Sequence, residues 1–180
     1  MVSFSAEGLV PIDSVTTSIG GSTVRIDVND DAYNYVYNVV FVAGQCDYSS
    51  AKPNIALFDK NGNYVRFSYA LNSTGTTTSN HSASSQITRL TNMTIGQNMF
   101  YTWIQIKHGY FRDLNGSVKE DAMLTAYTVS LPSSSGGSPI FDILSLRTCG
   151  DFDGPKEIQF SASLNSINVR RAASWGIMGK

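Results

Sequence analysis

Hydrophobic and polar residues alternate with a period of two along much of the chain. In segment 23–28 three aliphatic residues fall on one side, while Arg25 and Asp27 fall on the other, as in a strand with one buried face. Segment 157–164 repeats this pattern. Further apolar runs, each bounded by Gly, Pro, Asn or Asp, lie at 35–42, 54–59, 63–69, 99–106, 123–131 and 140–147. The pattern predicts about eight β-strands and no helix.

Turn signals separate these strands. Asn61-Gly62, and the similar sequence at 113–116, supply the positive φ that a tight hairpin turn requires. Two stretches rich in Ser, Thr and Gly, 72–85 and 132–139, contain no large side chain that would anchor them in a core. We expect both to be exposed loops.

Short strands with turns at this spacing predict an all-β fold, a single antiparallel β-sandwich that is jelly-roll-like. A length of 180 residues suits one domain with its own core. We expect a sandwich over 16–169, an extended N-terminal arm over 1–15 and a C-terminal arm over 170–180.

The apolar residues in the two expected arms need cover. Leaving Trp175 in water would forgo about 2 to 3 kcal/mol of burial free energy. Two arrangements stay open: the ends fold back onto their own domain, or they dock on another subunit. The candidate interface residues are Phe4, Leu9, Arg170, Arg171, Trp175, Ile177 and Met178.

Charge is scarce. Charged residues make up 15% of the chain, with a net charge of -1, against about 25% charged residues in an average domain. The chain therefore lacks the positive field that nucleic-acid binding needs. It also lacks an apolar run long enough to span a membrane. Residues 1–5 do not resemble a signal peptide, so we expect synthesis in the cytoplasm without membrane insertion.

Recognisable catalytic motifs are missing. The sequence has no G-x-S-x-G, no dinucleotide-binding glycine pattern and no P-loop, which are the usual marks of hydrolase and nucleotide chemistry. Of its two histidines, His81 lies in a predicted loop and His108 at a predicted strand end. We therefore expect a protein that is not an enzyme.

Metal and disulfide chemistry is limited too. Cys46 and Cys149 are too few for a zinc site; two buried thiols are favoured, and one bridge stays open. Oxygen ligands cluster at 27–31, 59–63 and 151–154, where calcium would bind, although Asp and Asn are also ordinary turn residues. We expect no cofactor, with a structural calcium as the alternative.

Aromatic residues form rows on two predicted strands. Tyr33, Tyr35 and Tyr37 share one face and are candidates for stacking against a glycan or for contacting a neighbouring subunit. Tyr101 and Trp103 share a face of the 99–106 strand. Because apolar residues lie on both faces of that strand, core packing is favoured for Trp103.

The strand–turn–strand sequence IALFDKNGNYVRF at 55–67, the Ser/Thr/Asn/Gly surface and the apolar ends resemble small structural proteins of tailed-phage particles: head decoration, tail and host-adsorption subunits. The hairpin also looks like part of the jelly-roll carbohydrate-binding modules on phage adhesins. The resemblance implies a non-enzymatic virion protein that assembles with itself or with other virion subunits. The alternative it implies is a carbohydrate-binding module that recognises a host-surface glycan. It does not specify host, position in the particle or symmetry.

Overall fold

The computed structural model describes thirteen strands in the residues it covers. These residues are 8–16, 19–29, 35–46, 52–73, 76–80, 87–90, 99–112, 114–131, 139–148, 154–162 and 167–178. The described residues include no helix long and apolar enough to cross a membrane. In chain order the strands are β1 (Val10–Val15), β2 (Ile19–Gly21), β3 (Thr23–Asp27), β4 (Tyr35–Cys46), β5 (Pro53–Asp59), β6 (Phe67–Ser73), β7 (Thr76–Asn80), β8 (Ile87–Arg89), β9 (Met99–Arg112), β10 (Val118–Ser130), β11 (Ile140–Thr148), β12 (Pro155–Ala162) and β13 (Ile167–Met178).

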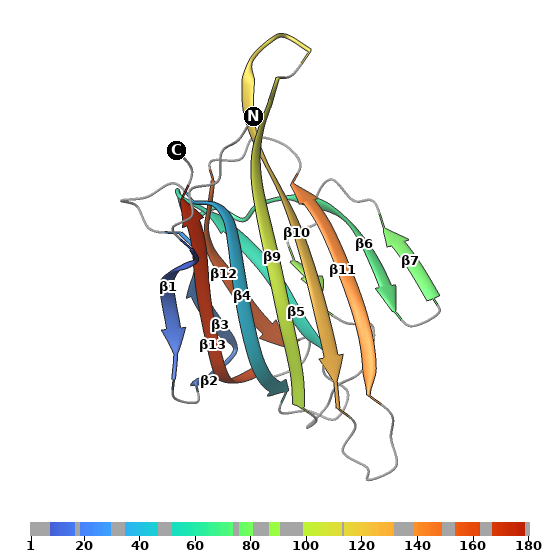
Figure 1. The fold of residues 1–180 in the computed structure, drawn as a ribbon. Helices are drawn as coiled ribbons and strands as arrows, with labels where there is room; N and C mark the ends of the chain where they lie inside the picture. Colours follow the sequence, from blue (N-terminus) through green and yellow to red (C-terminus); the bar gives the residue numbers. More distant parts are fainter. Residues whose placement is uncertain are drawn as a thin grey trace.

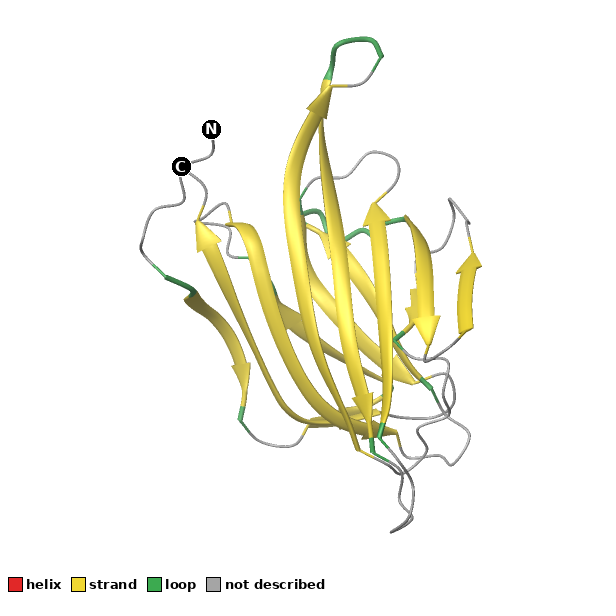
Figure 2. Cartoon of the chain, turned by 45° about the vertical axis from the view of Figure 1, so that its right-hand side comes forward, coloured by secondary structure: helices red, strands yellow, loops and turns green. Residues whose placement is uncertain are grey.

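The strands form two antiparallel sheets packed face to face (Figure 1). The larger sheet has nine strands in the order β1-β13-β4-β9-β10-β11-β6-β7, with β2 also paired to β13. The smaller sheet has the order β3-β12-β5-β8. Figure 2 shows the long strands of the larger sheet side by side. The predicted all-β antiparallel sandwich is therefore confirmed, with more strands than the sequence pattern predicts.

The core lies between the two sheets and is filled from both. Phe100 of β9 and Leu144 of β11 enter it from the larger sheet, and Ile26 of β3 and Phe160 of β12 enter it from the smaller one. All four are almost completely buried. Burying each such side chain contributes about 1.5 to 3 kcal/mol of transfer free energy. The face of each strand that carries these residues therefore turns toward the core, as the alternating pattern of the sequence predicts.

Both predicted hairpin turns are present. Gly62 and Gly116 have φ of 78° and 79°, a region that favours glycine. The Asp59 carboxylate accepts hydrogen bonds from the backbone N–H groups of Asn61 at 2.9 Å and Asn63 at 2.8 Å. This Asx-type capping fixes the turn that follows β5.

The stretch 72–85, predicted to be an exposed loop, instead contains β7 and the end of β6. The two strands pair antiparallel, with Asn72 opposite Thr77, and β7 is the last strand at one end of the larger sheet. An edge strand is stabilised by backbone pairing and by β-branched residues such as Thr, so it needs no large apolar anchor.

The predicted C-terminal arm over 170–180 is corrected by the structure. Residues up to Met178 belong to β13, which pairs with β4 on one side and with β1 and β2 on the other. A strand with neighbours on both sides has its backbone groups satisfied within the sheet. The C-terminal segment is therefore an interior strand of the sandwich and not an extension from it.

The N-terminal arm predicted over 1–15 is corrected in part. Residues 10–15 form β1 at the other end of the larger sheet, while residues 1–7 lie outside the described ranges. Ser174 Oγ accepts a hydrogen bond from Asp13 N at 3.1 Å and donates one to the Asp27 carbonyl. The Asp13 carboxylate accepts from Asp27 N at 3.1 Å, so β1 is tied to both sheets.

Candidate recognition face

The outward side of the larger sheet is the most distinctive surface of the described chain. It consists of alternate residues of β13, β4, β9, β10 and β11, because their neighbours in sequence point into the core. We call this side the outer face. The register of the strands aligns its residues into rows that run across the sheet, with neighbouring strands about 4.8 Å apart.

One row is aromatic and apolar. Phe41 of β4 lies opposite Trp103 of β9, which lies opposite Tyr127 of β10, and Tyr127 lies opposite Ile143 of β11. The rings of Phe41 and Trp103 are tilted by 56° with centroids 6.2 Å apart. Trp103 is 41% exposed and Tyr127 44% exposed, so this row presents ring surface to solvent.

A second apolar row lies two residues along the strands from the first. It contains Tyr101 of β9, Val129 of β10 and Phe141 of β11 in register. Phe141 is 57% exposed, the most of any aromatic residue with a described side chain. The two rows together form an apolar surface rich in aromatic residues, about two residues, or 7 Å, deep along each strand.

A polar row lies next to the first aromatic row, on the side away from the second apolar row. Gln105 of β9, Thr125 of β10 and Ser145 of β11 lie opposite one another in the ladder. Their side chains carry both hydrogen-bond donors and acceptors and no charge. The outer face thus places an aromatic row directly beside a row of neutral hydrogen-bonding groups.

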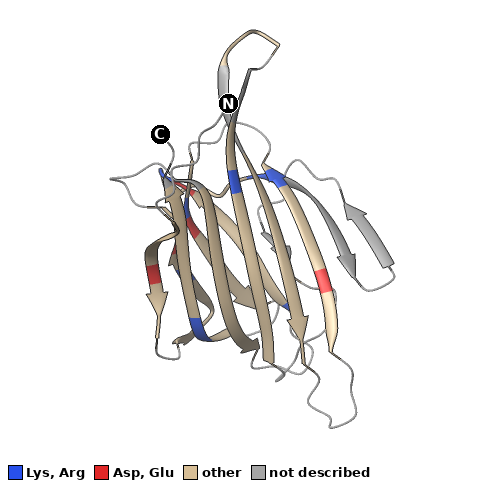
Figure 3. Ribbon diagram, viewed as in Figure 1, with Lys and Arg blue, Asp and Glu red and all other residues tan. Residues whose placement is uncertain are grey.

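Basic residues lie in two of the rows of the outer face. Lys107 of β9, Met123 of β10 and Arg147 of β11 form the next row beyond the polar one. In the other of the two, Arg171 of β13 lies opposite Ala43 of β4, in the same row as Tyr101. Figure 3 shows how few charged positions the central strands of the larger sheet carry.

The predicted glycan-stacking tyrosines are only partly described. Tyr37 of β4 is half-buried on the outer face, opposite Lys107. Burial, and to a smaller extent the nearby Tyr127 phenol, raises the pKa of Tyr37. Tyr35 belongs to β4, but its side chain is outside the described set, and Tyr33 lies outside the described residues.

The predicted interface residues are spread over β13 and the start of β1. Leu9 is 46% exposed, and Arg170 and Arg171 are exposed. Arg170 donates to Gln45 Oε1 at 2.9 Å. Trp175 and Ile177 are half-buried on the outer face, paired with Val39 and Tyr37 of β4. The side chain of Met178 and the whole of Phe4 lie outside the described set.

The outward side of the smaller sheet has a different character. Arg25 of β3 forms a salt bridge to Glu157 of β12 at 3.0 Å, and its guanidinium lies 4.2 Å from the centroid of the Phe58 ring. Phe58 also contacts the ring of Tyr64, with centroids 4.3 Å apart. These charged and aromatic groups contact one another, whereas Trp103 and Tyr127 of the outer face present ring surface to solvent.

Polar groups inside the sandwich are structural. The Asn38 side-chain amide donates to the Val28 carbonyl, so its Oδ1 is left to accept from Nε2 of His108 at 2.7 Å. Burial, and then Lys60, lowers the pKa of His108 to about 4. His108 is therefore neutral at pH 7 and links β9 to β4, within the strand rather than at its end.

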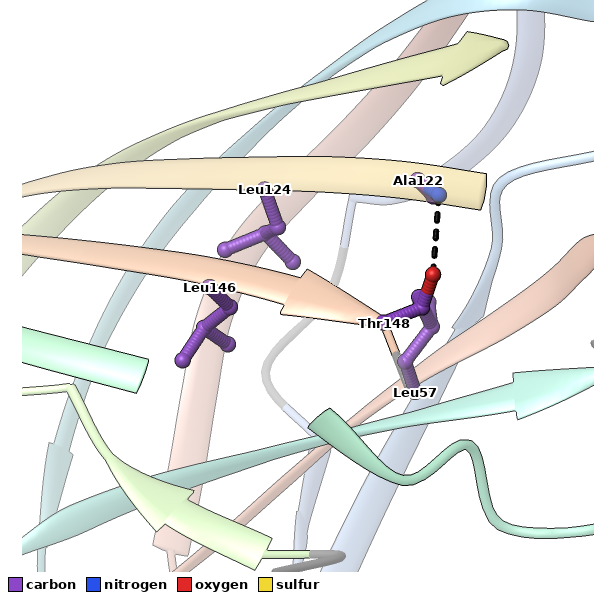
Figure 4. A pocket seen from close by; sticks show the side chains of 5 residues that line it. All are labelled: Leu57, Ala122, Leu124, Leu146 and Thr148. Carbon is purple, nitrogen blue, oxygen red and sulfur yellow. Dashed lines mark hydrogen bonds between the residues drawn. The ribbon is translucent and has the colours of Figure 1, made fainter. Parts of the chain in front are cut away.

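The described cavity between the sheets is too small for a ligand. It holds about 10 Å³, whereas ligand pockets usually hold several hundred. Leu57 from the smaller sheet and four residues of β10 and β11 line it, and within it Ala122 N donates to Thr148 Oγ1 at 3.0 Å (Figure 4). The cavity is a packing gap rather than a binding site.

The described side chains include no group of three or more His, Cys, Asp or Glu that could hold a metal ion. In the 59–63 cluster, the Asp59 carboxylate already accepts backbone hydrogen bonds from the turn. The segment 151–153 and Asp30 and Asp31 lie outside the described residues, so a structural calcium there stays a prediction. Cys46 is buried, and Cys149 is outside the described set, so their pairing stays open.

Sequence reasoning missed most of the outer face. It favoured core packing for Trp103, and the structure corrects this, because Ile104 and Ile106 face the core and Trp103 points outward. Tyr127 and Phe141 were not singled out, although each alternates with buried neighbours along its strand. Their common feature is cross-strand register, which a single sequence does not reveal.

The sequence matches no protein-family model and no curated protein. Among solved structures it is similar to the CBM2 module of the evolved Dit of Lactobacillus casei BL23 phage J-1. The two share 14% sequence identity over 99% of this chain and 80% of that chain, with a TM-score of 0.19. A likeness this weak does not establish kinship.

Proposed function

We propose that this protein is a non-enzymatic recognition module that binds carbohydrate on its outer face. The observation that supports the proposal is the exposed aromatic row of Trp103 and Tyr127 beside the neutral polar row of Gln105 and Thr125. A sugar ring has apolar C–H faces that pack against aromatic rings and a rim of hydroxyls that hydrogen-bond to amides and hydroxyls. The two rows supply both kinds of contact side by side.

The proposed test is a glycan array followed by calorimetry on the strongest hit. Replacing Trp103 by Ala should weaken binding at least about tenfold, because covering an indole contributes about 1.5 to 3 kcal/mol, and 1.4 kcal/mol is a factor of ten. Tyr64→Ala is the matched control, since Tyr64 is an exposed aromatic residue of the opposite side of the molecule. No retained glycan, or equal binding by Trp103→Ala, would contradict the proposal.

A second proposal is a virion structural subunit that assembles with copies of itself or with other subunits. Its support is that the outer face also exposes aliphatic side chains, Met123 and Ile143, beside Phe141. A continuous exposed apolar surface of this kind is typical of protein contacts. The placement in a tailed-phage particle rests on the resemblance of the sequence to such proteins, and host, neighbours and symmetry are not specified by it.

Light scattering over a range of concentrations tests assembly. A defined oligomer that dissociates when Ile143 is replaced by Lys, while Tyr64→Ala leaves it intact, would support the second proposal. Deleting residues 170–180 would not test assembly, because the deletion removes most of β13, an interior strand of the larger sheet. A monomer at all concentrations would contradict assembly through this face.

A further inference from the structure

We infer that the tip of the β9–β10 hairpin of one copy packs on the outer face of another copy, with Leu114 covering part of the two apolar rows. This inference rests on the second proposed function, assembly of the protein with itself. It adds which part of the neighbouring copy the outer face receives.

The β9–β10 hairpin is longer than the sheet that carries it. The pairing of β9 with β4 ends at Lys107, and the pairing of β10 with β11 ends at Met123. β9 and β10 continue to pair with each other as far as Arg112 and Val118, and Figures 1 and 2 show this hairpin reaching beyond the neighbouring strands. Within the described chain, β10 is the only strand that pairs with residues 108–112. A two-stranded ribbon is marginally stable in water by itself, so contact with another surface would stabilise it.

The tip of this ribbon carries an apolar side chain. Leu114 is 106% exposed, more than any other large hydrophobic residue with a described side chain. It lies in the turn that contains Gly116, whose φ is 79°. Single exposed leucines are common on protein surfaces. This one is at the end of a projection, where a partner could enclose it and gain the free energy of burying it.

Leu114 cannot reach the outer face of its own copy. β9 is continuous from Trp103 to Arg112, which is about 30 Å of strand at about 3.4 Å per residue. The tip is therefore far from the aromatic row of the same chain. A surface that covers Leu114 belongs to another molecule.

A second copy is the partner that the described surfaces favour. The outer face exposes Trp103, Phe141 and Ile143, an apolar surface of the kind that proteins use for contacts. One chain thus presents a narrow apolar projection and a broad apolar sheet face, in equal numbers. Contact between the tip of one copy and the face of the next covers both, and its repetition gives a closed pair or a ring.

Light scattering of the full-length protein over a range of concentrations tests this contact. Leu114→Asp should weaken association at least about tenfold and leave the urea midpoint unchanged, because the side chain is fully exposed. Asn115→Asp is the matched control: it adds the same charge at the next position, and Asp-Gly suits a hairpin turn as Asn-Gly does. It should associate like the wild type.

The outcomes separate this inference from the proposal beneath it. An oligomer that withstands Leu114→Asp but dissociates in Ile143→Lys would overturn the inference while assembly through the outer face stands. A wild-type monomer at all concentrations would overturn both. A monomer that binds phosphatidylcholine vesicles, and loses that binding in Leu114→Asp, would assign the tip to a lipid surface and likewise overturn both.

Mixing two variants gives a readout that loss of folding cannot imitate. Leu114→Asp keeps an intact outer face, and Ile143→Lys keeps an intact tip. A mixture of the two should therefore recover an association that neither shows alone, through the tip of the second variant and the face of the first. Two variants that stay monomeric when mixed would overturn the inference.

Discussion

Lowering the pH from 7 to 4 should destabilise the folded protein by about 3 kcal/mol through His108 alone. Burial, aided by Lys60, lowers the pKa of His108 to about 4 in the folded state, while the unfolded chain keeps an ordinary value of about 6.5. Above pH 6.5 the imidazole is neutral in both states and its contribution is complete. As the pH falls from 6.5 to 4, only the unfolded chain takes up the proton, so stability is lost.

The size of the effect follows from the two pKa values. Linkage gives a loss of about 2 kcal/mol by pH 5 and about 3 kcal/mol by pH 4, with little further loss below that. The physical reason is that the Nε2 hydrogen bond to Asn38 is made by the neutral ring. A second proton would place a positive charge in an environment that has lost its water.

Urea unfolding, followed by tryptophan fluorescence at pH 7, 6, 5 and 4, measures this loss. His108→Gln keeps an N–H donor for Asn38 but cannot titrate, so the wild type should lose about 2 kcal/mol more than this variant between pH 7 and pH 5. His81→Gln, which removes the other histidine, is the matched control. Parallel pH profiles of the wild type and His108→Gln, or a His108 pKa above 6 by NMR, would refute the reasoning.

Two further variants test the packing. Gly44→Ala should cost about 2 to 3 kcal/mol, because an added Cβ would lie 2.8 Å from the Asn168 carbonyl oxygen and 2.9 Å from the Phe100 ring. Gly109→Ala, whose Cβ would meet no atom within 4 Å, should leave the urea midpoint nearly unchanged. Equal midpoints for the two variants would contradict the close approach at Gly44. The buried Thr102 and Thr128 hydroxyls hydrogen-bond to each other at 3.0 Å. Thr102→Val should therefore lower the free energy of unfolding by about 1 to 3 kcal/mol, because it leaves the Thr128 hydroxyl unsatisfied, and the double valine variant should lose less than the single one. Strictly additive losses of stability would be inconsistent with that hydrogen bond.

The sequence alone predicts the inward faces of the sandwich well. In β3 and β12 the large apolar residues, such as Ile26 and Phe160, point into the core as the alternation indicates. The positive φ of Gly62 and Gly116 also follows from their turns. These features are local, since each depends on residues a few positions apart in the chain.

β13 shows why the rest is harder to predict. Over residues 172–177 its inward residues are small, Ala172 and Ser174, and its outward residues include Trp175 and Ile177, which reverses the usual pattern of a half-buried strand. Only at its start do large residues, Ile167 and Val169, face the core. The inward Ser174 hydroxyl accepts a hydrogen bond from Asp13 N of β1 and donates one to the Asp27 carbonyl of β3. That arrangement depends on partners more than a hundred residues away, so the segment resembles an arm until the sheet is known.

The pairing of β4 with β13 has a consequence for how the protein is made. Cys46 lies opposite Ile167. During synthesis, one edge of β4 therefore has no partner until the ribosome has made the chain through residue 167 and β13 has emerged. Closure of such a distant contact is slow, and an unpaired strand edge invites association with other nascent chains. Fragments that stop short of residue 167 should therefore precipitate rather than fold, and useful expression depends on completing the polypeptide before the edge meets another copy.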